Sequence, residues 1–396
     1  MKQITDCFLN NHLFYWNMKQ GSQAIAITNP GIEPVCEKEI DELVSPKKKD
    51  IKDSVVLFEP KDLIDLCTLC YRAQSVERIL LLKKHIQFSS ENQIFNAVKD
   101  IDFSDFLNES TFRVVCLRTG DHGFTSHEIE DGCGHNIDGK VDLNDPDVII
   151  YIYIRGNDCY IGIDFAGFDL SKRQHRIFNY RDTLKATVAY AMVRLGDYTQ
   201  DKFLLDPFAG SGTILIEAAL FASGFAVNHF NKEKFSFINF ECFSKTDFKK
   251  FFEDIDSKAD LKAVKSIRGL DPMLGHVKAI QKNAKIAGIN KAINASRADI
   301  EWLDTKIHEG ECEVMSTKPP QATERNIKAI DKIYKELFHQ TEFIMKKKGL
   351  MVLAAESQST EDILKKHSSE YKFRIKEIHK VTQGKKRMAI MVVQAQ

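Results

Sequence analysis

Residues 204–213 read Leu204-Leu205-Asp206-Pro207-Phe208-Ala209-Gly210-Ser211-Gly212-Thr213. An apolar strand that ends in a carboxylate and turns through glycines into a helix is typical of a ligand site, because glycine admits close approach to the backbone and the helix begins with free amide donors. A P-loop would need Lys after the second glycine and a dinucleotide fingerprint would need a third glycine, but Thr213 and Leu215 occupy these positions. The acidic strand end instead favours a ligand with a positive ammonium or sulfonium group, such as S-adenosylmethionine. The alternative is a glycine turn that only closes a strand–helix corner.

The chain around this motif alternates between strands and helices. From Thr183 onward we expect a helix over 184–195, a strand over 203–205, a helix over 213–222 and a strand over 266–270. This alternation predicts a parallel sheet with helices on both faces, which is the arrangement of a Rossmann-like α/β domain.

Two further carboxylates follow predicted strands. Asp271, which Pro272 follows, ends the strand after the glycine turn, where a carboxylate can bind both ribose hydroxyls. Asp271 lies 65 residues after Asp206, rather than the roughly 20 of a dinucleotide fold, so we expect an insertion near residues 228–262. Asp299 follows a short apolar segment and could accept the amino hydrogens of adenine, although a lone carboxylate in such a place is more often a surface residue or a helix cap.

A rigid turn follows the next apolar strand, at Lys318-Pro319-Pro320-Gln321. Two prolines fix the backbone at the carboxyl edge of the sheet, where ligands bind in open α/β sheets. A lone Pro-Pro pair would be interpreted as a strand terminator, but its position after three cofactor-like elements favours a place in the site.

The chain has 396 residues, of which 43% are hydrophobic and 28% charged, so we expect two or three globular domains. No run of about 18 apolar residues is present, and the first residues lack the pattern of a secretory signal, which favours a cytoplasmic protein. The nine cysteines are scattered. The closest pair, Cys67 and Cys70, has no second pair to complete a zinc site, so we expect no metal.

The charge is zero overall but unevenly distributed. Residues 1–180 carry 20 Lys and Arg against 28 Asp and Glu, whereas residues 181–396 carry 36 against 28. Electrostatics therefore favours the second half for contact with nucleic acid. The densest basic cluster of the acidic half is formed by Lys172, Arg173, His175 and Arg176.

The first part of the chain is predicted to form two small α+β units. The first has strands over 24–28 and 54–58, with a charged run over 47–50 that we interpret as a solvated loop. The second ends in two strands, 147–154 and 159–165, that form a hairpin.

From Ala24 to the end, the chain resembles the THUMP-containing RNA guanine-N2 methyltransferases. The resemblance is carried by residues 28–33, 164–176, 184–187 and 206–213, by Asp271 and Asp299, by the Pro-Pro turn and by residues 385–388. It implies an N-terminal extension over 1–22, a ferredoxin-like plus THUMP RNA-binding module over 23–172, a linker over 173–182 and a Rossmann-like methyltransferase domain over 183–396.

The same resemblance implies roles for individual residues. S-adenosylmethionine is expected to be bound by Asp206, Phe208, Gly210, Gly212, Thr213, Asp271, Pro272 and Asp299. Structured RNA, with tRNA favoured, is expected to contact Lys172, Arg173, His175, Arg176, Lys385, Lys386 and Arg387. The implied reaction is methylation of the exocyclic N2 amine of guanine, with Lys318, Pro319, Pro320 and Gln321 as the catalytic segment. Two alternatives are an RNA-binding member of the family with weakened catalysis and an amino-methyltransferase that acts on protein or DNA.

The catalytic segment departs from the family pattern, which is Asn or Asp, then Pro, Pro and an aromatic residue. Lys318 can donate hydrogen bonds but cannot accept them from an amine, and Gln321 cannot stack on a base as a ring does. If Lys318 impairs the pocket, Lys318→Asn with Gln321→Tyr should raise guanine methylation by about 10²-fold. The alternative is that Lys318 folds along the apolar wall and the carbonyls of Pro319 and a neighbour accept the amine hydrogens, in which case the wild type is already an active enzyme.

Overall fold

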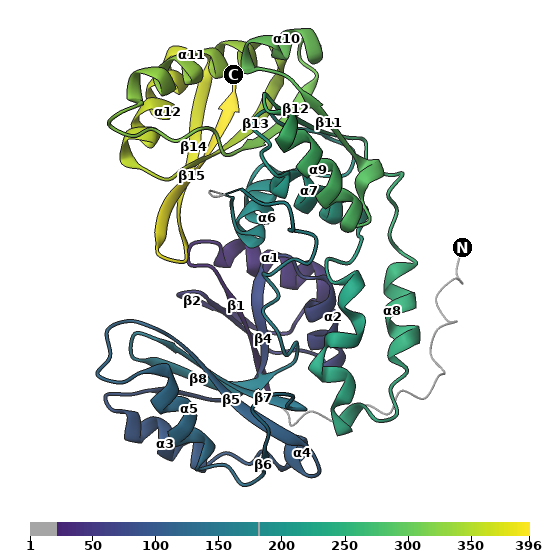
Figure 1. The fold of residues 1–396 in the computed structure, drawn as a ribbon, viewed down its shortest axis with the longest axis vertical. Coiled ribbons are helices and arrows are strands. Elements are labelled where there is room, and N and C mark those ends of the chain that lie inside the picture. Colours follow the sequence, from purple (N-terminus) through teal and green to yellow (C-terminus); the bar gives the residue numbers. More distant parts are fainter. Residues whose placement is uncertain (1–21, 181–182) are drawn as a thin grey trace, which may run out of the picture.

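The computed structural model describes residues 22–180 and 183–396, which fold around two separate sheets (Figure 1). Residues 22–180 are called the N-terminal module below, and residues 183–396 the C-terminal domain. In Figure 1 the sheet of the N-terminal module occupies the lower half of the molecule and the sheet of the C-terminal domain the upper half.

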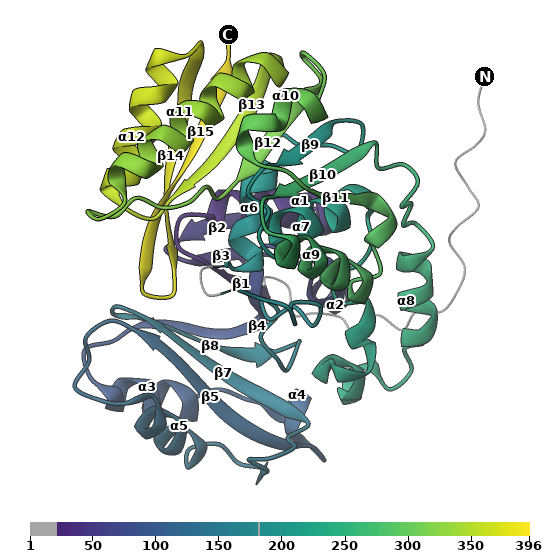
Figure 2. The same cartoon turned by 45° about the horizontal axis from the view of Figure 1, so that its top comes forward.

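The N-terminal module contains an eight-stranded sheet in the order β2-β3-β1-β4-β8-β7-β5-β6. Its strands are β1 (Gln23–Thr28), β2 (Lys49–Lys52), β3 (Val55–Phe58), β4 (Val76–Gln87), β5 (Thr111–Thr119), β6 (Lys140–Val141), β7 (Val148–Arg155) and β8 (Asp158–Asp164). Its helices are α1 (Glu33–Val44), α2 (Leu63–Arg72), α3 (Glu91–Lys99), α4 (Ser104–Leu107) and α5 (Ser126–Gly134). Figure 2 shows α3 and α5 on one face of the part of the sheet formed by β5, β7 and β8.

Strand β4 joins the two predicted α+β units into one sheet. It is 12 residues long and pairs antiparallel with β1 on one side and with β8 on the other. The predicted hairpin is confirmed, since β7 pairs antiparallel with β8. Gly156 in the connecting turn has a φ of 56°, a conformation that favours glycine.

The charged run from Lys47 to Asp50 is not entirely a loop, so that prediction is wrong in part. Lys49 and Asp50 belong to strand β2 at the edge of the sheet, where they pair with Phe58 and Leu57. An edge strand tolerates charged residues, and natural proteins use them there to prevent pairing with other chains. A charge run therefore does not distinguish a loop from an edge strand.

The C-terminal domain contains a seven-stranded sheet in the order β11-β10-β9-β12-β13-β15-β14. Its strands are β9 (Phe203–Asp206), β10 (Ser266–Asp271), β11 (Ile293–Arg297), β12 (Cys312–Thr317), β13 (Met345–Ala355), β14 (Phe373–Gln383) and β15 (Lys386–Ala395). Its α-helices are α6 (Ala186–Leu195), α7 (Thr213–Ser223), α9 (Leu274–Ile286), α10 (Leu303–Lys306), α11 (Ile327–Ile344) and α12 (Gln358–Glu370), and its 3-10 helices include η4 (Asn290–Ala292) and η5 (Ile300–Trp302). The strands from β11 to β13 are parallel, whereas β15 is antiparallel to both of its neighbours.

Alternate residues of the central strands enter two different cores, which confirms the α/β layering. Leu204 of β9 packs in the core that contains residues of α6, α7 and α9, whereas Leu205 packs in the core that contains residues of α11 and α12. Val314 and Met315 of β12 divide in the same way. Because helices cover both faces of the sheet, apolar residues that are neighbours in these strands are buried on opposite faces.

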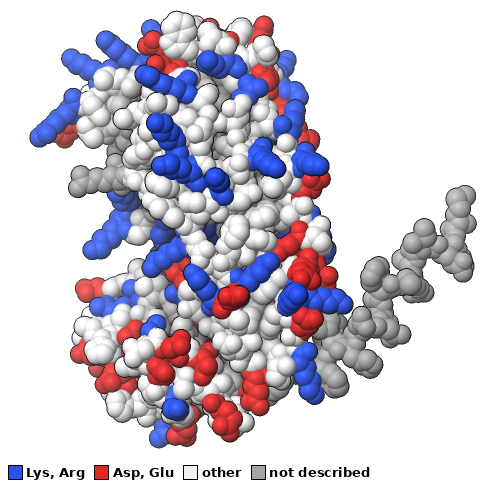
Figure 3. Space-filling view, turned by 45° about the vertical axis from the view of Figure 1, so that its right-hand side comes forward, with Lys and Arg blue, Asp and Glu red and all other residues white. Residues whose placement is uncertain are grey.

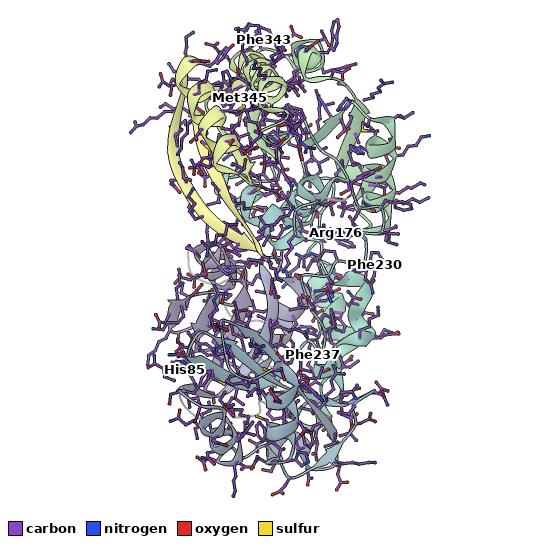
Figure 4. All side chains as sticks on the ribbon, turned by 60° about the vertical axis from the view of Figure 1, so that its left-hand side comes forward. His85, Arg176, Phe230, Phe237, Phe343 and Met345 are labelled. Atoms are coloured by element: carbon purple, nitrogen blue, oxygen red, sulfur yellow. The ribbon has the colours of Figure 1, made fainter. Side chains whose placement is uncertain are left out.

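The segment between α7 and β10 packs against the N-terminal module. It forms the 3-10 helices η1 (His229–Lys234), η2 (Ser236–Asn239) and η3 (Glu241–Phe243), followed by helix α8 (Phe248–Asp256). Phe235, Phe237 and Phe240 lie in the same core as the strands of the N-terminal module, and Figure 4 shows Phe237 at the level of that module. These residues fall within the range where we expected an insertion, and they tie the two halves of the molecule together.

A buried ion pair also connects the two halves. Arg173 Nε lies 3.0 Å from Glu217 Oε1, and both side chains are 0% exposed. Arg173 also donates to the carbonyl oxygens of Leu170 and Gln74, and Gln74 Nε2 donates to Glu217 Oε2 at 2.7 Å. Each charge in this cluster is thus compensated by an opposite charge and by hydrogen bonds, which is the condition under which buried charges are tolerated.

The hairpin formed by β14 and β15 reaches from the C-terminal domain to the N-terminal module (Figure 1). The amide of Thr382 donates to the carbonyl of Pro30 at 2.9 Å. Gly31 has a φ of 95°, and a Cβ at this position would lie 2.0 Å from the carbonyl oxygen of Lys380. Only glycine fits this turn, which holds the hairpin that carries residues 385–387.

Candidate active site

Four polar side chains stand at the carboxyl ends of four adjacent strands. In the order β10, β9, β12 and β13 they are Asp271, Asp206, Lys318 and Glu356. They line one pocket of about 650 Å³, a volume in the range of small-molecule sites. We call the part of the pocket over β10 and β9 its first half and the part over β12 and β13 its second half. Neighbouring strands lie about 4.8 Å apart, so the two halves are adjacent.

Asp206 lies in the first half of the pocket and is only 1% exposed. Its Oδ1 atom accepts hydrogen bonds from Thr317 Oγ1 at 2.6 Å and from the amide of Phe208 at 3.1 Å. Burial raises the pKa of Asp206 to about 7. A ligand ammonium group in the pocket would stabilise the ionised carboxylate, so this residue fits the amino-acid end of S-adenosylmethionine.

Asp271 and the glycine turn complete the first half. Asp271 Oδ2 accepts from the amide of Gly210 at 3.0 Å, and Oδ1 accepts from the amide of Met273 at 2.9 Å and lies 2.9 Å from His276 Nδ1. These bonds fix the carboxylate at the strand end. Gly210 has a φ of 54°, and a Cβ there would meet no atom within 4 Å. The bare backbone of the turn therefore leaves room for a ligand beside the carboxylate.

The structure brings most of the residues expected to bind the cofactor to this pocket. Those that line it are Asp206, Phe208, Gly210, Thr213, Asp271 and Pro272. Gly212 does not line the pocket but precedes α7, where its φ of 84° requires a glycine-like conformation. Asp299 is exposed and does not line this pocket, and its contact with adenine stays a prediction.

Sequence reasoning missed other residues that line the pocket. They include Tyr180, Thr183, Ser211, Met273, His276, Thr323 and Glu356. Tyr180 and His276 come from distant parts of the chain, and their ring centroids lie 4.1 Å apart. For Glu356 the only local signal was a carboxylate directly after the apolar run of residues 350–355 that ends β13.

Lys318 and Glu356 form an ion pair in the second half of the pocket. Lys318 Nζ lies 2.7 Å from Glu356 Oε1, and the two side chains are 12% and 15% exposed. Lys386 Nζ from β15 lies 3.7 Å from Glu356 Oε2. The charge of Lys318 is therefore balanced by a carboxylate within the pocket.

The side chain of Gln321 holds the Pro-Pro turn rather than facing into the pocket with a free amide. Its Nε2 atom donates to the carbonyl oxygens of Pro319 at 2.6 Å and Ala354 at 3.1 Å, and its Oε1 atom accepts from the amide of Glu356 at 2.7 Å. Gln321 thus ties the end of β12 to the end of β13.

The residues expected to contact RNA divide into exposed and buried groups. The exposed ones are Lys172, Lys385, Lys386 and Arg387. Arg173 is enclosed with Glu217, and His175 is 5% exposed, where burial lowers its pKa to about 4. Arg176 donates to the carbonyl of Leu184 at 2.7 Å, and Figure 4 shows it where the two halves of the molecule meet. The expectation that Arg173 and His175 contact RNA is corrected by their burial, since the Arg173 side chain is 0% exposed and His175 Nε2 is buried.

Comparison with known proteins gives the family. Residues 173–388 match the protein family described as RMKL-like, methyltransferase domain, and residues 88–164 match the THUMP domain. The first match spans more than half of the chain. The chain belongs to the RMKL-like methyltransferase family. The resemblance inferred from the sequence motifs is thereby confirmed.

Two archaeal relatives match this RMKL-like methyltransferase over most of its length. A tRNA (guanine(6)-N2)-methyltransferase of Methanocaldococcus jannaschii is 30% identical over 362 residues, which cover 87% of this chain and 93% of the relative. A tRNA (guanine(6)-N2)-methyltransferase of Archaeoglobus fulgidus is 29% identical over 343 residues, which cover 83% of this chain and 81% of the relative.

Solved structures share the fold of both halves. A possible methylase from Clostridium difficile superposes with a TM-score of 0.81 at 19% identity, covering 95% of this chain and 98% of its own. A methyltransferase complexed with SAH superposes with a TM-score of 0.78 at 20% identity, covering 96% of this chain and 99% of its own. The order of the two domains is thus a property of a wider group of structures.

Residues 22–180 and 183–396 contain neither a group of side chains suited to bind a metal ion nor a helix suited to cross a membrane. Within these ranges no group of three His, Cys, Asp or Glu side chains could hold a metal ion. No helix in this part of the chain is long and apolar enough to cross a membrane. Cys67 and Cys70 are fully buried on α2, where burial raises the pKa of both thiols.

The affinity for S-adenosylmethionine is expected to fall with decreasing pH. Asp206 has a pKa of about 7 and must be ionised to bind an ammonium group, so protonation below that pH weakens binding by up to about tenfold per pH unit. Calorimetry between about pH 6 and pH 8 measures this slope. Asp206→Asn, which cannot titrate, is the control and should bind weakly with a flatter pH dependence. An equal slope in the variant would show that another group causes it.

Proposed function

We propose that this protein transfers the methyl group of S-adenosylmethionine to the N2 amine of guanine at position 6 of tRNA, in the cytoplasm. The observation that carries the proposal is the pocket in which Asp206 and Asp271 stand beside the glycine turn, with the Lys318-Pro319-Pro320 turn on the adjacent strand. The tRNA substrate is supported by the two archaeal relatives, and an RNA substrate by the THUMP match.

Different residues of the pocket would bind the cofactor and the target base. When bound, S-adenosylmethionine supplies a methyl group that its sulfonium already activates. Asp206 would hold the ammonium group and Asp271 the ribose hydroxyls, and together they would fix the methyl group relative to the second half of the pocket. The Pro-Pro turn would hold the target base, taken out of its stack, within reach of that group. Most of the acceleration then comes from positioning.

The test is transfer of a labelled methyl group from S-adenosylmethionine to transcribed tRNA, followed by digestion and mass spectrometry of the nucleosides. We expect N2-methylguanosine at position 6, and none in a tRNA with adenine at that position. Label in protein or DNA but not in tRNA would support an amino-methyltransferase of another kind. Binding of tRNA without any transfer would support a catalytically weakened family member.

Asp271→Ala is expected to weaken S-adenosylmethionine binding by about 1–3 kcal/mol, because it removes charge-assisted bonds to the ribose. It also removes the acceptor that fixes the Gly210 amide. Calorimetry on the purified variant measures the change. Asp304→Ala is the matched control, since Asp304 is exposed outside the pocket and its removal should leave the affinity unchanged. Unaltered binding by the Asp271 variant would remove that residue from the site.

RNA affinity is expected to depend on the exposed cluster Lys385, Lys386 and Arg387, with Lys172 as a further contact. Figure 3 shows Lys and Arg over much of the upper half of the molecule, while Asp and Glu are frequent in the lower half. Removing one cation that binds a phosphate should flatten the slope of log affinity against log salt by roughly 0.7–0.9. Changing residues 385–387 to Gln should therefore reduce the slope by about 2.

The matched control changes Lys346, Lys347 and Lys348 to Gln. These residues are also exposed but lie at the opposite end of β13 from the pocket. Filter binding of tRNA over a range of salt concentrations compares the two variants. Equal slopes in both would show that the RNA lies on another face.

A further inference from the structure

We infer that Lys318 and Glu356 together recognise the Watson–Crick edge of the target guanine, with Glu356 as a specificity-determining residue. The inference rests on the proposed function, because it assigns the base contacts of that reaction. It is carried by an ion pair, 2.7 Å between Lys318 Nζ and Glu356 Oε1, that lies within the pocket itself.

The place of the pair along the sheet assigns it to the substrate rather than to the cofactor. The two carboxylates suited to S-adenosylmethionine, Asp206 and Asp271, end β9 and β10. Lys318 follows β12, which lies next to β9 on its other side, and Glu356 follows β13, the next strand beyond β12. A base that receives a methyl group from the first half of the pocket must enter the second half, where this pair is found.

The pair is held in a fixed position by the backbone around it. The amide of Glu356 donates to Gln321 Oε1, and Gln321 Nε2 donates to the carbonyls of Pro319 and Ala354. Both prolines restrict the turn after Lys318. A donor and an acceptor are thus presented side by side by two neighbouring strand ends, and both side chains remain partly exposed.

The hydrogen-bonding pattern of the pair matches guanine. Guanine presents the acceptor O6 next to the donors N1–H and N2–H. A lysine ammonium can donate to O6, and a carboxylate can accept from N1–H and from one N2–H, because it is an acceptor with two oxygens. Adenine places an acceptor at N1 and a donor at N6, so it would face the carboxylate and the ammonium with like polarity. The same pair therefore selects guanine and rejects adenine.

The pair also removes an electrostatic conflict in the pocket. An uncompensated lysine would repel the sulfonium group of the cofactor. Glu356 neutralises Lys318 at 2.7 Å, while the second cation near this carboxylate, Lys386, is 3.7 Å away with its side chain 54% exposed to solvent. The charge carried by this turn is thus compatible with methyl transfer.

The test compares two bases at the target position of tRNA, guanine and 2-aminopurine. 2-Aminopurine keeps the N2 amine but lacks O6 and N1–H, so of the hydrogen bonds assigned to the pair it can form only the one from N2–H to the carboxylate. In single-turnover transfer by the full chain, we expect the wild-type protein to methylate guanine about 10²-fold faster than 2-aminopurine, because the analogue leaves Lys318 without an acceptor and the carboxylate without N1–H.

Glu356→Gln and Lys318→Met are expected to slow guanine methylation at least about tenfold and 2-aminopurine methylation much less, so that the preference for guanine shrinks. Glu356→Gln keeps the backbone bond to Gln321, which limits its effect on the turn. Glu311→Gln, which alters an ion pair with Arg268 at the start of β12, is the matched control and should keep the preference. Cofactor affinity, measured by calorimetry, should remain the same in Lys318→Met and Glu311→Gln, and should fall only slightly in Glu356→Gln, where Lys318 loses the carboxylate that neutralises it.

The outcomes separate this inference from the proposed function. If the wild-type protein methylates guanine but the variants slow both bases equally, or keep the full preference, the pair does not read the base and the inference is overturned. Failure of the Lys318→Met variant to bind the cofactor would place the pair with the cofactor and also overturn it. If the wild-type protein methylates no guanine in tRNA, the proposed function fails, and this inference fails with it.

Discussion

Arg173→Met is expected to lower the free energy of the first unfolding transition by about 3–5 kcal/mol, because it leaves the carboxylate of Glu217 buried without its cation. Arg173 contributes two nitrogens to Glu217 and further bonds to two backbone carbonyls. Gln74 would remain as a neutral donor to the carboxylate and would compensate only a small part of this destabilisation. Urea denaturation followed by circular dichroism measures the shift.

The adjacent residue provides the control for this prediction. Lys172→Met removes the same charge from an exposed position and should change stability by less than about 0.5 kcal/mol. Removing both buried charges in Arg173→Met with Glu217→Leu should be less destabilising than removing Arg173 alone, because no unpaired charge remains. Equal destabilisation by Lys172→Met and Arg173→Met would show that the buried pair does not hold the two halves together.

The parts of the fold that the sequence predicts are those with a local signal. Strand β9, the glycine turn and helix α7 follow from consecutive residues, and Asp271 follows from its place at a strand end. Strand β4 has no such signal, since its apolar run, residues 79–82, is short and is flanked by charged residues on both sides. It is stabilised instead by pairing with both β1 and β8, which are far apart in the sequence of the N-terminal module.

The basic cluster near residue 173 shows why the surface was harder to predict than the cofactor pocket. Lys172 and Arg173 have the same charge and are neighbours in the sequence, yet one is exposed and the other is enclosed. The difference is made by Glu217, which lies 44 residues later on α7. The burial of a charged residue cannot be recognised from its neighbours in the sequence when its partner lies 44 residues away along the chain.

Glu356 was missed for a related reason. Its carboxylate matters only because β13 lies next to β12 in the sheet, so that the residue after one strand meets Lys318 after the other. The sequence predicted both a turn at 318–321 and an unusual lysine within it. It could not predict the partner, because strand order is set by packing of the whole domain.

This pairing reverses the effect expected for Lys318→Asn with Gln321→Tyr. From sequence alone the double variant should restore an acceptor and a stacking ring. In the structure, however, Glu356 already provides an acceptor beside Lys318, and Gln321 makes three hydrogen bonds that hold the turn. Removing these interactions, at about 1–3 kcal/mol for the charged pair and about 1 kcal/mol for each neutral bond, should lower guanine methylation by at least roughly 10²-fold.

Single-turnover rates of the wild type, both single variants and the double variant on one tRNA decide between the two expectations. We expect Lys318→Asn to slow transfer because Glu356 no longer faces a cation, and Gln321→Tyr to slow it because the turn is no longer bonded to Pro319, Ala354 and Glu356. The effects of the two changes should not be additive, since both displace the same carboxylate. A double variant that is faster than the wild type would show that Lys318 impairs the pocket, and Glu356 would then serve only to neutralise it.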